Sequence, residues 1–115
     1  MTDAYTADAL FAGKEPVVRE TYDRLLEVLH ELGPFKVEPK KTSIHLVNTV
    51  GFAGVHPRKS FLYLNLRTEK PIESPRVAKT EQVSKNRYHN EIKLEKPNDV
   101  DSQLCTWLKE AYLLG

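Results

Sequence analysis

"SFLYLNLRT" (residues 60–68) alternates leucine with other side chains at a period of two. Because successive side chains of a β-strand point to opposite faces of a sheet, Leu62, Leu64 and Leu66 share one face. The opposite face takes the residues between and beside them, which are Phe61, Tyr63, Asn65 and Arg67. The stretch therefore predicts a strand with one face in the core and one face open.

The same period continues in "KNRYHNEIKL" (residues 85–94) and in residues 43–46. The side chains expected to face the core are Ile44, Leu46, Tyr88, Ile92 and Leu94. Those expected to face outward are Ser43, His45, Arg87, His89, Glu91 and Lys93. The alternation that buries Ile92 and Leu94 thus places His89 on the outward face of the sheet.

Turn residues divide the middle of the chain into short β-type runs rich in β-branched and aromatic residues. We expect strands near residues 35–39, 42–48, 51–56, 60–67, 78–84 and 87–94. The connections between them are too short for parallel crossovers, which favours antiparallel neighbours.

A helix is predicted on each side of these strands. Residues 14–33 carry an apolar stripe at helical spacing, made by Val18, Tyr22, Leu25, Leu29 and Leu32. Pro16 suits the first turn, and Gly33 followed by Pro34 stops the helix. Residues 96–115 predict a second helix, with Asn98 as its N-cap.

The chain of 115 residues is long enough for one core. Residues 1–12 show no sustained period and are expected to form a loose leader before a single domain at 13–115. The order of elements predicts an α+β fold, in which an antiparallel, twisted sheet of about six strands carries both helices on one face. The other face then stays at least partly open.

Composition restricts the class of protein. Apolar residues make up 40% and charged residues 29% of the chain, as in ordinary globular proteins. No membrane-spanning or secretory segment is recognisable. Cys105 is the single cysteine and is expected to pack as a small apolar residue. A lone thiol suits a reducing compartment, so we predict a cytoplasmic protein.

The net charge of +1 conceals an uneven distribution. Residues 1–39 hold four basic and eight acidic side chains, residues 40–90 hold ten and three, and residues 91–115 hold three and five. A basic centre between acidic ends can attract an anion, or it can pair internally with the acidic elements.

One candidate surface follows from charge and alternation together. It comprises Lys41, His45, Lys59, Tyr63, Arg87 and His89. Rings interleaved with cations on a sheet are typical of surfaces that bind single-stranded nucleic acid or another anionic ligand. The alternative is a solvated face whose long side chains only cover apolar surface.

The sequence gives weaker support for other kinds of site. His45, His56 and His89 lack the short spacings of metal ligands, so we expect no metal site and no cofactor. A hydrolase or transferase could use His89 as general base with Lys41 stabilising charge, which requires a concave site joining the two. A protein-interaction module docking through a strand edge or helix face is a third possibility.

Several separated stretches resemble a bacterial family, the domain of unknown function 5655. They are "FAGKEPVVRETYDRLLEVLHELGP", "KKTSIHLVNTVGFAGVHPRK", "SPRV", "NRYHNEIKLEKPNDVD" and "WLKEAYLL", and they extend from about Phe11 to Leu114. The resemblance implies a small α+β domain that occurs alone or attached to larger proteins, some labelled predicted transport proteins. It implies no catalytic assignment.

Within the resemblance, Lys41 and Thr42 match a Lys-Thr pair, and Phe52 matches an aromatic position. His89 matches the first member of what is often a His-His pair, whose second position here is Asn90. Alternation points Asn90 inward, where its amide needs a buried partner. We therefore predict a non-catalytic module that binds an anionic partner through the open sheet face.

Overall fold

The computed structural model describes residues 6–114. In chain order its elements are α1 (Ala7–Phe11), α2 (Pro16–Leu32), β1 (Lys36–Pro39), β2 (Ile44–Val47), β3 (Gly51–Pro57), β4 (Leu62–Thr68), β5 (Val77–Ser84), β6 (Arg87–Leu94), the 3₁₀ helix η1 (Pro97–Asp99) and α3 (Ser102–Leu114). Among these residues no helix combines the length and apolar character needed to cross a membrane.

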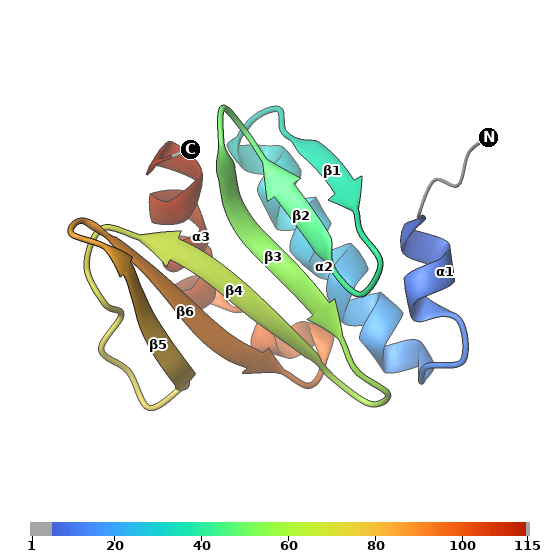
Figure 1. Ribbon diagram of the computed structural model, residues 1–115. Helices are drawn as coiled ribbons and strands as arrows, with labels where there is room; N and C mark the ends of the chain where they lie inside the picture. Colours follow the sequence, from blue (N-terminus) through green and yellow to red (C-terminus); the bar gives the residue numbers. More distant parts are fainter. Residues whose placement is uncertain (1–5, 115) are drawn as a thin grey trace.

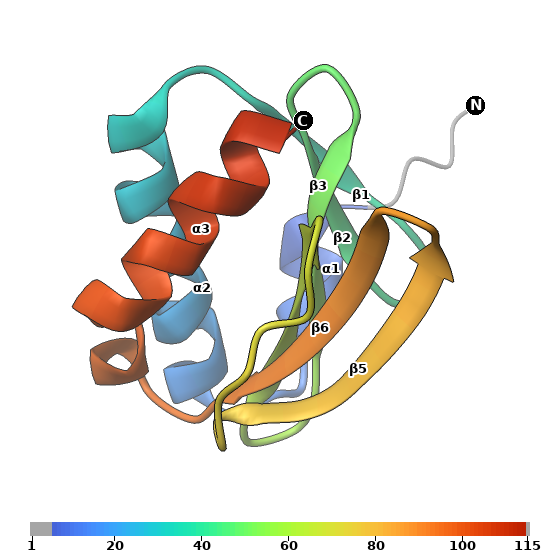
Figure 2. The same ribbon diagram turned by 90° about the vertical axis from the view of Figure 1, so that its left-hand side faces the viewer.

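The strands form one antiparallel sheet in the order β1-β2-β3-β4-β6-β5. Helices α2 and α3 lie side by side against one face, and the opposite face, here called the outer face, turns toward the viewer in Figure 1. The quarter turn in Figure 2 separates the two layers and shows the strong curvature of the β5–β6 hairpin. The predicted α+β fold with both helices on one face is confirmed.

Side-chain alternation is observed along the central strands. Leu62, Leu64 and Leu66 are fully buried under the helices, as are Ile92 and Leu94 from the neighbouring strand. His45 is exposed next to buried Ile44 and Leu46. Ser43 departs from the predicted pattern because it is buried; it precedes β2, in the turn where its carbonyl accepts a hydrogen bond from the Lys40 amide at 2.7 Å.

A bulge interrupts the alternation in β3. The pairing with β2 passes from Leu46 opposite Ala53 to Val47 opposite Gly51, so Phe52 is an extra residue. The bulge turns Phe52 into the core, where its ring packs edge-on against Tyr112 with 5.4 Å between centroids.

The helix ends agree only partly with prediction. Pro16 starts α2, and Gly33 ends it at φ 149°. The predicted N-cap Asn98 is wrong for the last helix, because it lies in η1. Asp101 caps α3 instead, since its Oδ1 accepts a hydrogen bond from the Leu104 amide at 3.0 Å.

Part of the predicted loose leader is helical. Residues 7–11 form α1, whose N-terminus is capped by the Thr6 hydroxyl accepting from the Ala9 amide at 3.1 Å. Phe11 is buried against Tyr22, with 4.9 Å between ring centroids. Five residues are too few to show a helical period, which explains why the sequence did not reveal the helix. Residues 1–5 of the predicted leader lie outside the described residues.

Asn90 has the buried partners that its inward position required. Its Nδ2 donates to the Thr68 hydroxyl at 2.8 Å and to the Leu66 carbonyl at 3.2 Å. Its Oδ1 accepts from the Ile72 amide at 3.0 Å and from the Thr80 hydroxyl at 3.3 Å. Asn90 therefore fixes β6 to β4, to β5 and to the link between them.

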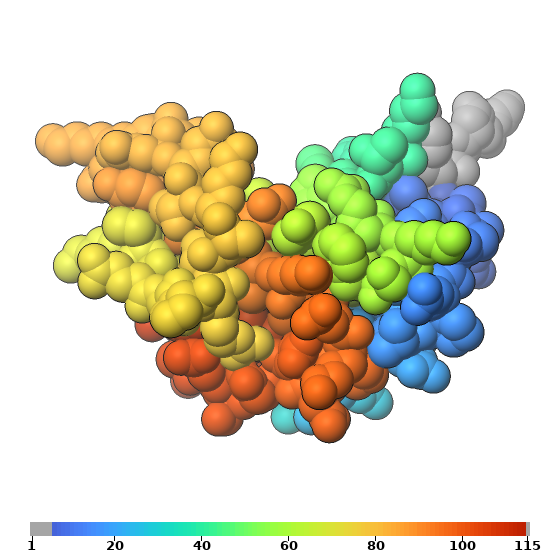
Figure 3. All heavy atoms as spheres, turned by 90° about the horizontal axis from the view of Figure 1, so that it is seen from below, coloured from blue at the N-terminus to red at the C-terminus, as the bar shows by residue number. Residues whose placement is uncertain are grey.

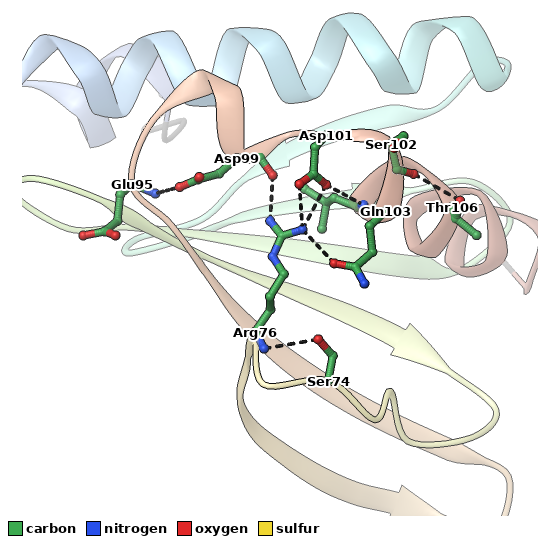
Figure 4. A network of polar contacts seen from close by, with 9 residues as sticks. Ser74, Arg76, Glu95, Asp99, Asp101, Ser102, Gln103 and Thr106 are labelled. Carbon is green, nitrogen blue, oxygen red and sulfur yellow. Dashed lines mark hydrogen bonds and ion pairs between the residues drawn. The ribbon is translucent and has the colours of Figure 1, made fainter.

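Arg76 fastens that same link to the start of α3 (Figure 4). Its guanidinium donates to Asp101 Oδ1 at 2.9 Å, to the Gln103 side-chain oxygen at 3.1 Å and to the Asp99 carbonyl at 2.8 Å. The hydrogen bond from Leu104 and the contact with Arg76 together hold the pKa of Asp101 below its ordinary value. These contacts, here called the Arg76 clamp, tie the link between β4 and β5 to the start of α3.

Candidate functional site

The strand register brings polar side chains together on the outer face. One cross-strand row contains His45, Gly54, Asn65 and Glu91. The next row in one direction contains His56, Tyr63 and Lys93, and in the other direction Arg67 lies opposite His89. Strands β2, β3, β4 and β6 thus contribute to one surface, although their residues are far apart in sequence.

This surface is concave. A hollow of about 360 Å³, called the outer hollow below, is lined by His45, Gly51, Phe52, Ala53, Gly54, His56, Asn65, Arg67 and His89. Figure 3 looks along the sheet with the outer face at the top, where a notch separates the orange and yellow atoms of the β5–β6 side from the green and teal atoms of the β1–β4 side. Concave surfaces of this size are typical of small-ligand sites.

Gly54 makes room for the outer hollow. Its φ is not positive, so the backbone does not require glycine here. A Cβ on Gly54 would meet only ordinary contacts, 3.6 Å from His56 Nε2 and 3.9 Å from Asn65 Cβ, so packing does not require glycine either. Glycine in the middle of a strand costs stability and often marks a place where a ligand approaches the backbone. Gly54 is itself buried, and the missing side chain leaves space in the hollow next to His56 and Asn65.

Among residues 6–114, Arg67 is the one permanently charged side chain that lines the outer hollow. It is half-buried, and its Nη1 donates to the Gly51 carbonyl at 2.8 Å. Within residues 6–114 no carboxylate lies within ion-pair distance of Arg67, whereas Arg19, Arg24 and Arg76 all have one. A guanidinium has five N–H donors, so most of those on Arg67 remain free for an oxyanion.

Three histidines line the same hollow as this guanidinium, and they differ in environment. Burial, followed by the nearby charge of Arg58, lowers the pKa of His56 below its ordinary value of 6.5. His56 is therefore neutral near pH 7 and can donate or accept one hydrogen bond. His45 is exposed, while His89 is half-buried with Glu81 and Arg67 opposite it on the adjacent strands.

Metal ligation does not explain the three histidines. In the described part of the chain, no three His, Cys, Asp or Glu side chains come close enough together to hold a metal ion. The three imidazoles and the unpaired guanidinium instead line one hollow, where they offer hydrogen-bond donors and one permanent positive charge. Such a set suits an oxyanion such as a phosphate or carboxylate group.

The structure brings together only some of the predicted site residues. His45 and His89 line the outer hollow, and Tyr63 adjoins it opposite His56. Arg87 lines a neighbouring hollow of about 400 Å³ that shares Arg67. Lys41 and Lys59 are exposed in the turns before β2 and before β4, and neither lines the outer hollow.

The proposed pairing of His89 with Lys41 in one concave site finds no support in this arrangement. His89 lies at the Arg67 end of β4, whereas Lys41 precedes β2, at the end where Ile44 is opposite Val55. Cys105 lies on the helix layer, half-buried, and burial raises the pKa of its thiol. A neutral thiol away from the hollow fits the predicted packing role.

Seven residues that line the hollow were missing from the predicted site: Gly51, Phe52, Ala53, Gly54, His56, Asn65 and Arg67. Alternation in residues 60–68 already turned Asn65 and Arg67 outward, and His56 follows Gly54 at the strand period. The sequence could not show that β6 lies beside β4, which is what brings His89 to Arg67.

Residues 7–115 match the family described as Domain of unknown function (DUF5655), over nearly the whole chain. Comparisons with curated proteins and with solved structures find no match.

Proposed function

Because the chain belongs to the domain of unknown function 5655 family, whose description gives no activity, we propose from the site geometry that the outer hollow binds an oxyanion. The ligand presents a phosphate or carboxylate group to Arg67, and His45, His56, His89 and Asn65 supply further hydrogen bonds. The protein is then a binding module, and its lone cysteine fits the cytoplasm.

One observation carries this proposal. Arg67 is half-buried at one end of the outer hollow and has no carboxylate partner in the described residues. A partly desolvated charge is costly to leave without a counter-ion, and a bound anion would supply one. Gly54 supports the proposal independently, because neither the backbone nor packing requires a glycine there, and it leaves space next to His56 and Asn65 in the same hollow.

Isothermal titration with inorganic phosphate tests the proposal. Arg67→Met removes the guanidinium but keeps an apolar stem of similar length. A charge-assisted hydrogen bond contributes about 1.5–3 kcal/mol, so the affinity of the variant should fall roughly tenfold or more.

Arg24→Met is the matched control. Arg24 lies on α2, on the helix side of the sheet, and pairs with Glu27 at 3.2 Å. This variant loses the same charge far from the hollow and should bind phosphate as the wild type does. Equal weakening by both substitutions would mean that net charge, not the hollow, attracts the anion.

A further inference from the structure

We infer that the oxyanion belongs to single-stranded nucleic acid, whose backbone phosphate occupies the outer hollow while a base stacks on Tyr63. This inference rests on the proposed function, because it assumes that Arg67 holds a phosphate. It adds a second contact, made by an aromatic ring that adjoins the hollow.

The ring of Tyr63 is placed for this contact by the sheet register. Tyr63 lies on the outer face of β4 with His56 opposite it on β3 and Lys93 opposite it on β6. His56 lines the hollow, so the ring lies next to its rim. Phe61 packs edge-on against Tyr63, with 5.2 Å between centroids and 85° between ring planes. Two half-buried rings thus form a platform on an otherwise polar surface.

Cations accompany this platform. The Arg58 guanidinium lies 5.5 Å from the centroid of Tyr63, and Lys93 Nζ lies 4.4 Å from the centroid of Phe61. Arg58 is exposed and, within residues 6–114, has no ion-pair partner. Its side chain can swing outward to admit a base and then cover it, because a guanidinium stacks on a base as it does on tyrosine.

The spacing of Tyr63 and Arg67 along β4 indicates that the ligand is a nucleic-acid strand and not a single nucleotide. Tyr63 and Arg67 are four residues apart, which at strand rise corresponds to roughly 13 Å. Consecutive nucleotides of an extended single strand can span that distance. A duplex cannot make the same contacts, because its bases are stacked on one another and unavailable to Tyr63.

The test compares ligands that differ in one component. Binding is measured for inorganic phosphate, for an abasic deoxyribose-phosphate hexamer, and for single-stranded hexamers of deoxyuridine and of uridine. The proteins are the wild type, Arg67→Met, Tyr63→Leu and Tyr63→Phe. Tyr63→Phe keeps the ring, so it separates stacking from the hydroxyl group, and urea unfolding of each variant confirms that it is folded.

Base-bearing hexamers should bind the wild type at least about tenfold more tightly than the abasic hexamer does, because stacking of each base is favourable. Tyr63→Leu should abolish that difference while leaving phosphate affinity unchanged, and Tyr63→Phe should retain it. Arg67→Met should weaken all ligands. Preference for the uridine or the deoxyuridine hexamer, which differ only in the 2′-hydroxyl, identifies RNA or DNA as the source.

Two failures are distinguishable. Equal affinity of abasic and base-bearing hexamers, with phosphate binding still dependent on Arg67, overturns the nucleic-acid inference and leaves the oxyanion site intact. Phosphate binding that is absent, or unaffected by Arg67→Met, overturns both.

Discussion

Arg67 on β4 donates a hydrogen bond from Nη1 to the carbonyl oxygen of Gly51 on β3, at 2.8 Å. Gly51 lies directly before the extra residue Phe52, so the contact spans the bulge at one end of the outer hollow. The guanidinium is thus held in place by a neutral partner that leaves its charge uncompensated. This relationship connects the irregularity of β3 to the proposed oxyanion site.

Arg67→Lys should separate geometry from charge. Lysine keeps the positive charge but lacks the planar fork that can hold the Gly51 carbonyl and an oxyanion together. We expect phosphate affinity between those of the wild type and Arg67→Met, and a loss of stability of about 1 kcal/mol from the missing hydrogen bond. Titration calorimetry and urea unfolding measure the two quantities; a lysine variant that binds as tightly as arginine would show that charge alone suffices.

Side chains added at Gly54 should affect stability and phosphate binding in opposite directions. Gly54→Ala adds a methyl group with only ordinary contacts and removes a strand glycine, which should raise the free energy of unfolding by about 0.5–1 kcal/mol. Gly54→Val extends farther into the hollow and should weaken phosphate binding. Thermal unfolding and titration of both variants test this. Undiminished binding by Gly54→Val would place the ligand elsewhere.

His56 should make stability depend on pH. Its folded pKa is lower than the ordinary 6.5, chiefly through burial, so the unfolded chain binds more protons between those two values. The contribution of neutral His56 to the free energy of unfolding is fully present above about pH 6.5. It is lost as the pH falls through the pKa of His56 in the folded protein.

His56→Gln removes this titration while keeping a neutral hydrogen-bonding side chain. Urea unfolding of the wild type between about pH 8 and 5 should show a decline that the variant largely lacks. Asp101, whose pKa is also lowered, acts in a separate window below its ordinary 3.8. Identical pH profiles for the two proteins would contradict the assignment.

Arg76 should be important for stability and not for binding. Its side chain is 26% exposed and has several partners near the start of α3, so Arg76→Ala should cost about 1–2 kcal/mol after allowing for solvent screening of exposed Asp101. Arg76→Lys should recover only a part, because lysine cannot reach these partners together. Phosphate affinity should stay unchanged in both variants. A stability change below about 0.3 kcal/mol in Arg76→Ala would show that the clamp is unimportant.

Gly33 should tolerate no side chain. At φ 149° an L-residue is strained, and a Cβ would collide with the Tyr112 hydroxyl, which donates to the Pro34 carbonyl at 2.8 Å. Gly33→Ala should destabilise by about 1–3 kcal/mol. Removing the hydroxyl in Gly33→Ala/Tyr112→Phe should relieve part of that cost in a double-mutant cycle. Strict additivity of the two changes would contradict the collision.

The sequence predicted those parts of the fold that follow from a local period. Leu62, Leu64 and Leu66 fixed the buried face of β4, and the stripe from Val18 to Leu32 identified α2. Each predicted strand lies within two residues of an observed one. The Phe52 bulge and the Asp101 cap depend on contacts that are formed only in the folded chain, so no period reveals them.

The site was predicted less completely for the same reason. Alternation correctly predicted that His45 and His89 lie on the outer face. Which outward residues lie close together depends on the strand order, which alternation does not give. Lys41 and Lys59 looked suitable by charge alone, and the register puts them in turns away from the hollow. The space at Gly54 could not be predicted, because a glycine in a strand can mark a bulge, a bend or a close approach of a ligand, and only the neighbouring strands decide which.

The location of the bound anion tests the oxyanion site most directly, and backbone amide NMR can follow it during a phosphate titration. The largest shift changes should occur at Gly51, Gly54, His56, Arg67 and His89, with one common dissociation constant, which Arg67→Met should raise roughly tenfold or more. Changes centred on the turns around Lys41 and Lys59, or distributed over α2 and α3, would contradict an oxyanion site in the outer hollow.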